Sequence, residues 1–536
     1  MNTSLPKITQ IPDFQTGSEL IDGVPLADPI AATNEINLIL DSLLAATLEH
    51  QVYFELLERL CLPITFVTEK LTKCYLNKPV PLDEEEDAFF QRVELLWIKM
   101  AQAYTRCVEL GMPEFEDSSR LEHLAILLYR CIHFTGMAII EHYRARREVP
   151  WGLWLDLHSH YRTAEEKRVD KLPLPNILEE HTEQTHCAAA YLAFVLCEMA
   201  GSYSLSLRDQ KLVRRWAIDW APTIGLHAVA AGQPLPAFVI DLLQDVALRS
   251  SQECMRIDQI RRLDTTLLAD HIVQIRQKLR QRIPPSQIGL GEDCTRHQCA
   301  SLLSLLSRQW SQARAARKFR RHATSGLVRI STGFEEMYYF ISGKEFRQPE
   351  HPRLSPGSSF DDVFALRFQG TQQQTPQFQQ EKLAASYKAD VWEMVDQSAN
   401  GFRLIRHVDG RRIAHGQLLA LSPQDNARYL LAQVTWLMQA SNGGLIAGLR
   451  VLPGLPQAIS ARSSAASEIG PKKQYQRAFL LPALPTAEAE ESLVLPSGWF
   501  RPELVIDIYT DSAKCAKLKK VLESGPDFER VSFDLE

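Results

Sequence analysis

The chain has 536 residues, and its hydrophobic content of 45% and charged content of 23% are those of an ordinary folded protein. This length exceeds what one hydrophobic core normally covers, so we expect several domains. The formal net charge of -6 excludes a generally basic protein that coats nucleic acid, and any anion-binding site must therefore be local.

The N-terminal part is predicted to be helical after a short tail. Residues 1–30 are expected to be extended, and they hold no apolar stretch of the kind found in secretory signals. Apolar residues recur at three-to-four spacing from 31 to 310, which predicts a helical domain of stacked helices with a solenoid-like arrangement and no clean sequence repeat. Its predicted helices, separated by prolines such as Pro63, cover 35–60, 63–77, 84–111, 118–147, 186–200, 207–220 and 236–281.

The helical domain is not expected to enter a membrane. Its most apolar run, 188–200, contains Glu198 and is too short to cross a bilayer. The ten cysteines are scattered, mostly within apolar helical patterns, which indicates reduced thiols packed as small hydrophobic residues. We therefore expect a cytoplasmic protein.

The pattern changes to short strands near residue 310. Strand signals separated by turn residues at 326–331, 387–408, 410–422, 427–439 and 444–452 predict a small antiparallel β-barrel within 311–455. Residues 334–342 fit either a helix or a strand, and the segment at 345–385, rich in Gln, Pro and Ser, predicts a mobile insertion.

The last part, 456–536, is predicted to be β-rich, with one helix at 512–523. It either forms a second small β module or completes the first barrel. The fold class predicted for the whole chain is therefore multidomain α + β.

A basic run and a polar turn are the two candidate binding motifs. The run directly precedes the first barrel strand and contains Arg314, Arg317, Arg320 and Arg321. Arginine stays charged, and its planar fork of donors fits phosphate oxygens or the O6 and N7 atoms of guanine. A solvated basic helix end and an RNA-binding or anionic-surface patch are alternative interpretations of the same run.

The polar turn is the sequence DQSANG between two predicted strands, and it contains Asp396, Ser398 and Gly401. Aspartate and serine favour turns, and glycine permits unusual backbone angles, so a plain β-turn is one interpretation. A carboxylate at this position also suits the N1 and N2 donors of guanine.

The order of these motifs resembles the PilZ domain, a six-stranded barrel that binds the bacterial second messenger cyclic di-GMP. Arg317 and Arg321 fill the family pattern Arg-x-x-x-Arg, and Asp396, Ser398 and Gly401 fill Asp/Asn-x-Ser-x-x-Gly. The resemblance implies a cyclic di-GMP site at these residues. The gap between Arg321 and Asp396 is longer than in the family, so the domain is divergent and carries an insertion.

Two further features belong to the same resemblance. The sequence AGLRVL at 447–452 resembles the closing strand of the family, with Leu449 and Val451 at its apolar positions. Arg314 and Arg320 are implied as additional clamps on the ligand. A long surface loop within a barrel costs little, because loop-closure entropy grows only logarithmically with length.

The resemblance implies a bacterial receptor and not an enzyme, since the chain has no Walker loop, dinucleotide-binding fingerprint or diguanylate-type catalytic signature. Binding would be transmitted through the helical domain to an unidentified protein partner, with outputs such as motility, pili or biofilm. Two alternatives stand beside this hypothesis. One is a ligand-free adaptor or chaperone that acts through protein contacts alone, and the other is a basic-patch RNA binder.

No metal site or cofactor is expected. Cys294, His297 and Cys299 do not have the spacing of a standard structural zinc site. Histidines in HSHYR at 158–162 and HTEQTH at 181–186 have no partner that fixes a metal geometry. The acidic stretch at 83–87 is interpreted as the start of a helix.

Overall fold

The computed structural model describes residues 10–112, 115, 120–179, 183–229, 235–251, 257–311, 322–349, 387–423, 428–463, 474–485 and 488–535. The chain divides into two compact units. We call them the helical unit, Met1–Arg317 with Met438–Ser441, and the barrel unit, Lys318–Leu437 with Asn442–Glu536.

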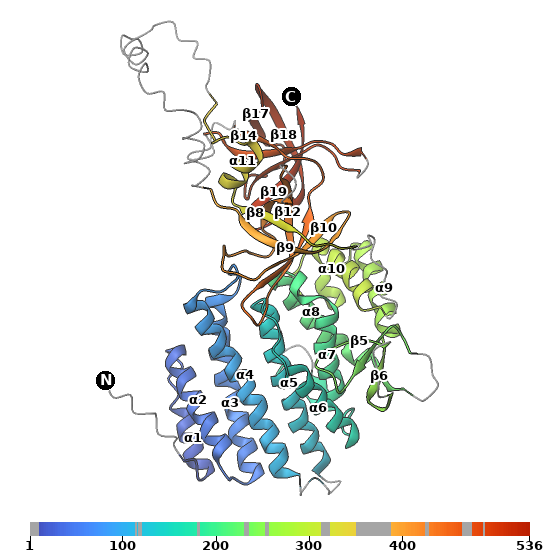
Figure 1. Ribbon diagram of the computed structural model, residues 1–536. Helices are drawn as coiled ribbons and strands as arrows, with labels where there is room; N and C mark the ends of the chain where they lie inside the picture. Colours follow the sequence, from blue (N-terminus) through green and yellow to red (C-terminus); the bar gives the residue numbers. More distant parts are fainter. Residues whose placement is uncertain are drawn as a thin grey trace, which may run out of the picture. The chain divides into compact units, whose positions relative to one another are not determined.

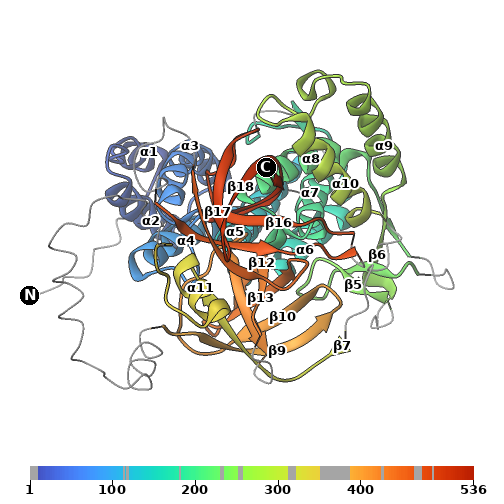
Figure 2. The same cartoon turned by 90° about the horizontal axis from the view of Figure 1, so that it is seen from above.

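The helical unit is built from helices that follow one another across the unit in chain order (Figure 1 and Figure 2). Their apolar stripes meet in one large core. The helices are α1 Phe14–Asp22, α2 Pro29–Ala45, α3 His50–Tyr75, α4 Glu84–Gly111, α5 Leu121–Arg144, α6 Leu153–Glu166, α7 Cys187–Met199, α8 Leu207–Trp220, α9 Thr266–Arg280 and α10 Arg296–Gln309.

Local sequence signals explain where several of these helices begin. Asp28 accepts hydrogen bonds from the first turn of α2, and Pro29 occupies its first position. The acidic stretch before α4 starts that helix as predicted, since Asp83 and Glu86 form a reciprocal capping box. The helical prediction for this part of the chain is thus largely confirmed.

Helix α5 lies in the middle of the helical core. Among the described residues it is the one helix long and apolar enough to cross a membrane, with a mean hydropathy of 1.5. However, 83% of the most apolar 18-residue stretch of α5 is buried inside the unit, which is the environment of a core helix.

Three sequence predictions for this unit are wrong. Part of the predicted tail is a helix, because Asp13 caps α1 and Ile21 packs into the core. Pro63 does not divide two helices but lies inside α3, where the fully buried Leu60 and Ile64 pack on either side of it. Packing there outweighs the roughly 3 kcal/mol that proline costs within a helix.

The third error is in the predicted helix 236–281, because its described residues before α9 include strands. A four-stranded antiparallel sheet joins β3 Gly225–Ala228, β6 Ile260–Asp264, β4 Phe238–Asp241 and β5 Arg249–Ser250. Two short strands, β1 Leu174–Pro175 and β2 Gln184–Thr185, pair separately. The helical unit therefore carries a small sheet in addition to its helices.

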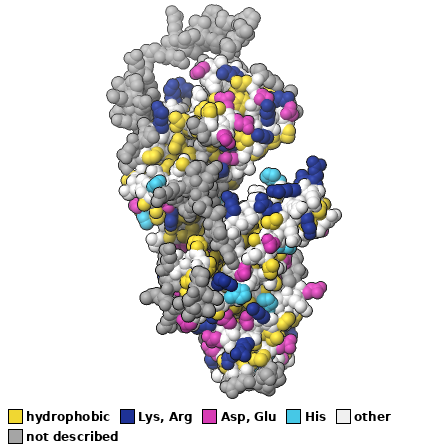
Figure 3. All heavy atoms as spheres, turned by 90° about the vertical axis from the view of Figure 1, so that its right-hand side faces the viewer, with side chains coloured by type: hydrophobic (Ala, Val, Ile, Leu, Met, Phe, Trp, Pro, Cys, Tyr) yellow, Lys and Arg dark blue, Asp and Glu magenta, His cyan; other side chains and the backbone are white. Residues whose placement is uncertain are grey.

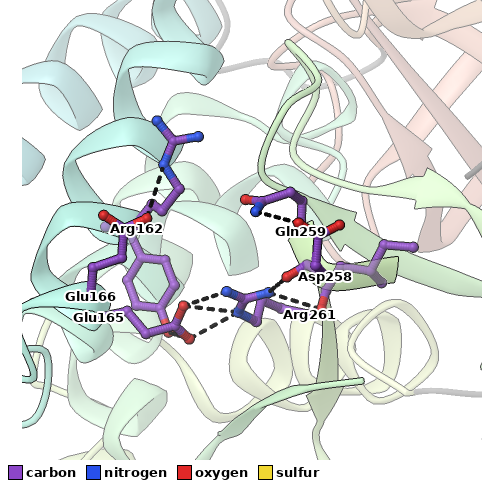
Figure 4. A network of polar contacts seen from close by, with 8 residues as sticks. Arg162, Glu165, Glu166, Asp258, Gln259 and Arg261 are labelled. Atoms are coloured by element: carbon purple, nitrogen blue, oxygen red, sulfur yellow. Dashed lines mark hydrogen bonds and ion pairs between the residues drawn. The ribbon is translucent and has the colours of Figure 1, made fainter. Parts of the chain in front are cut away.

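A buried ion pair ties this sheet to α6 (Figure 4). Arg261 of β6 donates from Nε to both carboxylate oxygens of Glu165, at 2.9 and 3.0 Å. The Tyr161 hydroxyl donates to the same carboxylate at 3.1 Å. The Arg261 side chain is only 9% exposed, so loss of its partner would leave a buried charge uncompensated.

We expect Glu165→Gln to lower the free energy of unfolding by about 2 kcal/mol, because it removes a charge-assisted hydrogen-bond pair. Urea denaturation followed by circular dichroism measures this loss. Glu166→Gln is the matched control, because Glu166 is 67% exposed and makes a long contact of 3.8 Å with Arg162. This variant should change stability by less than about 0.5 kcal/mol. Equal stability of both variants would contradict this prediction.

The barrel unit begins with a ring of antiparallel strands. They are β7 His322–Ala323, β8 Leu327–Thr332, β9 Asp390–Ser398, β10 Gly401–Arg406, β11 Leu418–Pro423, β12 Leu430–Gln439 and β13 Leu445–Val451. The sheet order is β10-β13-β12-β11-β8-β9-β7, and the additional pairing of β10 with β9 closes it. This first barrel confirms the predicted small antiparallel barrel, and residues 334–342 form helix α11, Phe334–Ser342.

A second, closed barrel follows in the chain. Its strands are β14 Gln457–Ser463, β15 Gln476–Leu481, β16 Ser492–Pro496, β17 Val505–Tyr509, β18 Ala513–Ser524 and β19 Phe528–Leu535. The predicted helix at 512–523 is therefore wrong, since these residues form β18. The two barrels share an apolar cluster that includes Met337, Leu418, Phe479 and Phe528.

Candidate functional site

The predicted motif turn is the β9–β10 hairpin of the first barrel. Asp396 lies opposite Arg403, and Ser398 lies opposite Gly401. Residues directly opposite in an antiparallel pair project to the same face of the sheet. The neighbouring Leu404 is buried in the interior, so these four residues lie on the outer face. We call Asp396, Ser398, Gly401 and Arg403 the motif face.

Backbone contacts explain the small residues of this hairpin. The Ser398 hydroxyl donates weakly to Asn400 Oδ1 at 3.3 Å and to the Gly401 carbonyl at 3.4 Å, which holds the turn. A Cβ atom at Gly401 would lie 2.4 Å from the carbonyl oxygen of Leu449 on β13. Only glycine fits there without moving the strand.

The arginines of the basic run, Arg314, Arg317, Arg320 and Arg321, lie outside the described residues. The strand that follows the run is described. In β7, Ala323 lies opposite Asp396 and His322 lies opposite Gln397. The Thr324 amide donates to the Val395 carbonyl at 3.2 Å. The strand that follows the basic run is thus paired with the strand that carries Asp396, although the two strands are far apart in the sequence.

An arginine and a tryptophan that the sequence analysis did not single out extend the motif face. Arg403 lies opposite Gly448 of β13 as well as opposite Asp396. A Cβ atom at Gly448 would lie 1.7 Å from Nε1 of Trp436, so the indole of this β12 residue covers the glycine. The Arg403 guanidinium lies 5.8 Å from the centre of the Trp436 ring.

A second arginine, Arg450, lies opposite Gly401 on the same face. Its guanidinium donates to Gln433 at 2.8 Å and pairs with Glu523 of the second barrel at 3.2 Å. The face therefore offers cationic and aromatic side chains around the carboxylate of Asp396. Strand pairing brings these residues together, and no local sequence pattern signals it.

The helical unit carries a separate groove with a volume of about 910 Å³. Its lining includes Lys73 of α3, Arg144 of α5 and Lys211 of α8. At its base Arg214 pairs with Glu179. Burial and the nearby arginine charges hold the pKa of His133, which also lines the groove, well below its ordinary value.

Cationic side chains also gather on the lobe formed by α9 and α10 (Figure 3). Its exposed members are Lys278, Arg280, Arg282, Arg296 and Arg308. This is a second basic surface, distinct in sequence from the predicted arginine run, and an anionic polymer is the kind of ligand that such a surface attracts.

No group of three or more His, Cys, Asp and Glu side chains in the described part of the chain has the arrangement of a metal site. Cys299 is fully buried while His297 is exposed, so they do not converge on one ion. His158 is a buried core residue whose ring nitrogens contact the Tyr191 hydroxyl at 2.8 Å and the Val246 carbonyl at 3.0 Å. His181 lies outside the described residues, and His186 caps α7.

Two segments of the chain match known protein-family models, and the chain is similar to one curated protein. Residues 16–231 match a family model described as "Cyclic-di-GMP receptor FimW, N-terminal domain", and residues 463–535 match "FimW C-terminal beta-barrel domain". A curated Pseudomonas aeruginosa protein named "Cyclic-di-GMP receptor FimW" is 22% identical over 476 residues, or 82% of this chain and 77% of that protein. No solved structure matches. These matches indicate a family of cyclic di-GMP receptors, and none of the descriptions names a PilZ domain.

Proposed function

We propose that this chain is a cytoplasmic, non-enzymatic receptor that binds cyclic di-GMP at the motif face of its first barrel. The residues proposed to hold the ligand are those of the two sequence motifs, Arg314, Arg317, Arg320, Arg321, Asp396, Ser398 and Gly401.

The pairing of Ala323 with Asp396 is the observation that carries this proposal. Arg321 directly precedes His322 in the chain, so a short link connects the basic run to the strand beside Asp396. We therefore propose that both motifs contribute to one site.

The chemistry of the residues suits a dianionic purine dinucleotide. Guanidinium groups bind phosphate oxygens or the O6 and N7 edge of guanine. A carboxylate such as that of Asp396 accepts hydrogen bonds of the kind that the N1 and N2 donors of guanine offer. The close packing of Gly401 against the Leu449 carbonyl leaves the turn free of side-chain bulk. The description of the N-terminal family model and the name of the relative favour the same ligand.

We further propose that binding is transmitted to a protein partner through the helical unit. The groove described above, with a volume of about 910 Å³, is the candidate site for this partner. Six Lys and Arg and four Asp and Glu side chains line it, which favours an acidic segment. Motility, pilus function and biofilm formation are the candidate outputs.

Calorimetric titration of the purified chain with cyclic di-GMP tests the receptor function. We expect saturable binding, with weaker or no binding of GMP and of cyclic di-AMP. Binding of single-stranded RNA without binding of the dinucleotide would instead support the RNA-binding alternative, and Arg280 on the basic lobe would then be the first residue to replace. Binding of neither would favour an adaptor that acts through protein contacts alone.

Hydrogen exchange on the same sample tests the transmission step. If the ligand changes the protection of α3 or α8, which line the groove, the helical unit responds to binding. Unchanged exchange throughout the helical unit at saturating ligand would contradict this part of the proposal and leave the binding site itself unaffected.

A further inference from the structure

We propose that Trp436 and Arg403 form a stacking platform for a guanine base of the bound dinucleotide. This inference rests on the proposed cyclic di-GMP site and adds two residues that belong to neither sequence motif.

Trp436 packs against the barrel at a glycine. The indole Nε1 occupies the space that a Cβ atom at Gly448 would need, because that atom would lie 1.7 Å away. Any other residue at this position would push the indole off the strand. The ring stays half-buried on the outer face, beside the motif residues. An indole fixed in this manner presents an aromatic surface at little cost in side-chain entropy.

Arg403 links this aromatic surface to the motif. It lies opposite Asp396 on one side and opposite Gly448 on the other. Its guanidinium lies 5.8 Å from the centre of the Trp436 ring. Its Nε is buried and has no hydrogen-bond partner among the described residues. An unsatisfied buried donor is costly, and an acceptor on the bound ligand would satisfy it.

Together the three side chains fit one purine. A base that stacks on the indole or on the guanidinium plane would place its polar edge toward the Asp396 carboxylate. The Arg403 donors would then meet a base or phosphate oxygen of the same nucleotide. Stacking on an aromatic side chain tolerates any base, so selection of guanine would come from Asp396 and Arg403, while Trp436 supplies affinity.

The test combines affinity with a spectroscopic signal. We expect Trp436→Ala to weaken cyclic di-GMP binding by about tenfold or more, the scale of one lost stacking contact. Trp436→Phe should bind within a few-fold of the wild type, because a smaller ring still stacks. The wild-type tryptophan emission should change on saturation with ligand, and Trp436→Phe should lose most of that change.

Trp151→Phe is the matched control for the emission signal, since Trp151 is 86% exposed on the helical unit. It should retain the ligand-induced change. Arg403→Gln should weaken binding to a similar degree as Trp436→Ala and reduce the preference for cyclic di-GMP over cyclic di-AMP.

The outcomes separate this inference from the function on which it rests. If Trp436→Ala and Arg403→Gln bind like the wild type while Asp396→Ala does not, the platform is wrong and the receptor function stands. If Trp436→Phe keeps the full emission change, the base does not contact the indole, and the platform is likewise wrong. If the wild type itself binds no cyclic di-GMP, both proposals fail together.

Discussion

Replacing Asp396 or Arg321 by alanine is expected to weaken cyclic di-GMP binding by about tenfold or more for each change. Each variant removes one side of a charge-assisted hydrogen bond, which contributes about 1.5–3 kcal/mol, and each 1.4 kcal/mol corresponds to about tenfold in affinity. Arg317→Ala should behave in the same way if the two arginines clamp one ligand. Calorimetry at fixed salt measures the change, because phosphate contacts weaken as ionic strength rises.

The controls for these variants lie on the second barrel. Asp511 is exposed between β17 and β18, and Lys514 is exposed on β18. Asp511→Ala and Lys514→Ala alter the net charge by the same amounts as the site variants but should leave affinity unchanged. If they weaken binding equally, the effect reflects overall charge and not the motif face. If Asp396→Ala binds cyclic di-GMP with wild-type affinity, the motif turn is not part of the binding site.

Many strands of the barrel unit could be predicted from the sequence, because successive side chains of a strand point to opposite faces of the sheet. β17 shows this period-two burial along its whole length and β8 over its first four residues, and the turn residues between strands mark their ends. Asp396, Ser398 and Gly401 were predicted to form a turn between two strands, and the structure places them in the β9–β10 hairpin.

Other elements were misread because their periodicity is broken. In β18 the pairing register shifts between Leu518 and Lys520 and again between Val521 and Glu523. Each bulge moves the following residues to the other face, and the apolar residues Leu518, Val521 and Leu522 consequently recur at the i, i+3, i+4 spacing of a helix. In β4 the last three residues are all buried, and a short, continuous apolar run cannot be distinguished from a piece of a buried helix.

The platform residues were beyond sequence reasoning for a different reason. Arg403, Trp436 and Gly448 come from three strands, and only the pairing of β10 with β13 and the packing of the indole bring them together. Each residue alone is ordinary in a strand. The register between strands depends on the whole barrel, so a single sequence does not reveal which residues become neighbours.

The largest stability effect is expected in the helical unit, at Glu58. Its carboxylate accepts hydrogen bonds from Arg130 Nε at 2.8 Å and Nη2 at 3.0 Å, and from the Tyr104 hydroxyl at 2.6 Å. The Arg130 side chain is only 3% exposed. Glu58→Ala leaves this guanidinium buried without its counter-charge, so we expect a loss of about 3–5 kcal/mol in the free energy of unfolding. Urea denaturation followed by the helical circular dichroism signal measures it.

The charge on Glu58 also makes this contribution depend on pH. Burial raises the pKa of the carboxyl, but the hydrogen bonds and charge of Arg130 outweigh it and hold the pKa below its ordinary value of 4.5. A lowered folded-state pKa stabilises the protein above about pH 4.5, and this stabilisation disappears as the pH falls through the lower value. The stability gap between the wild type and Glu58→Gln should therefore be constant near neutral pH and shrink in acid. Glu55→Gln, exposed on the same helix, should show no such gap at any pH. A gap that persists unchanged in acid would mean that packing, and not the ion pair, stabilises this part of the core.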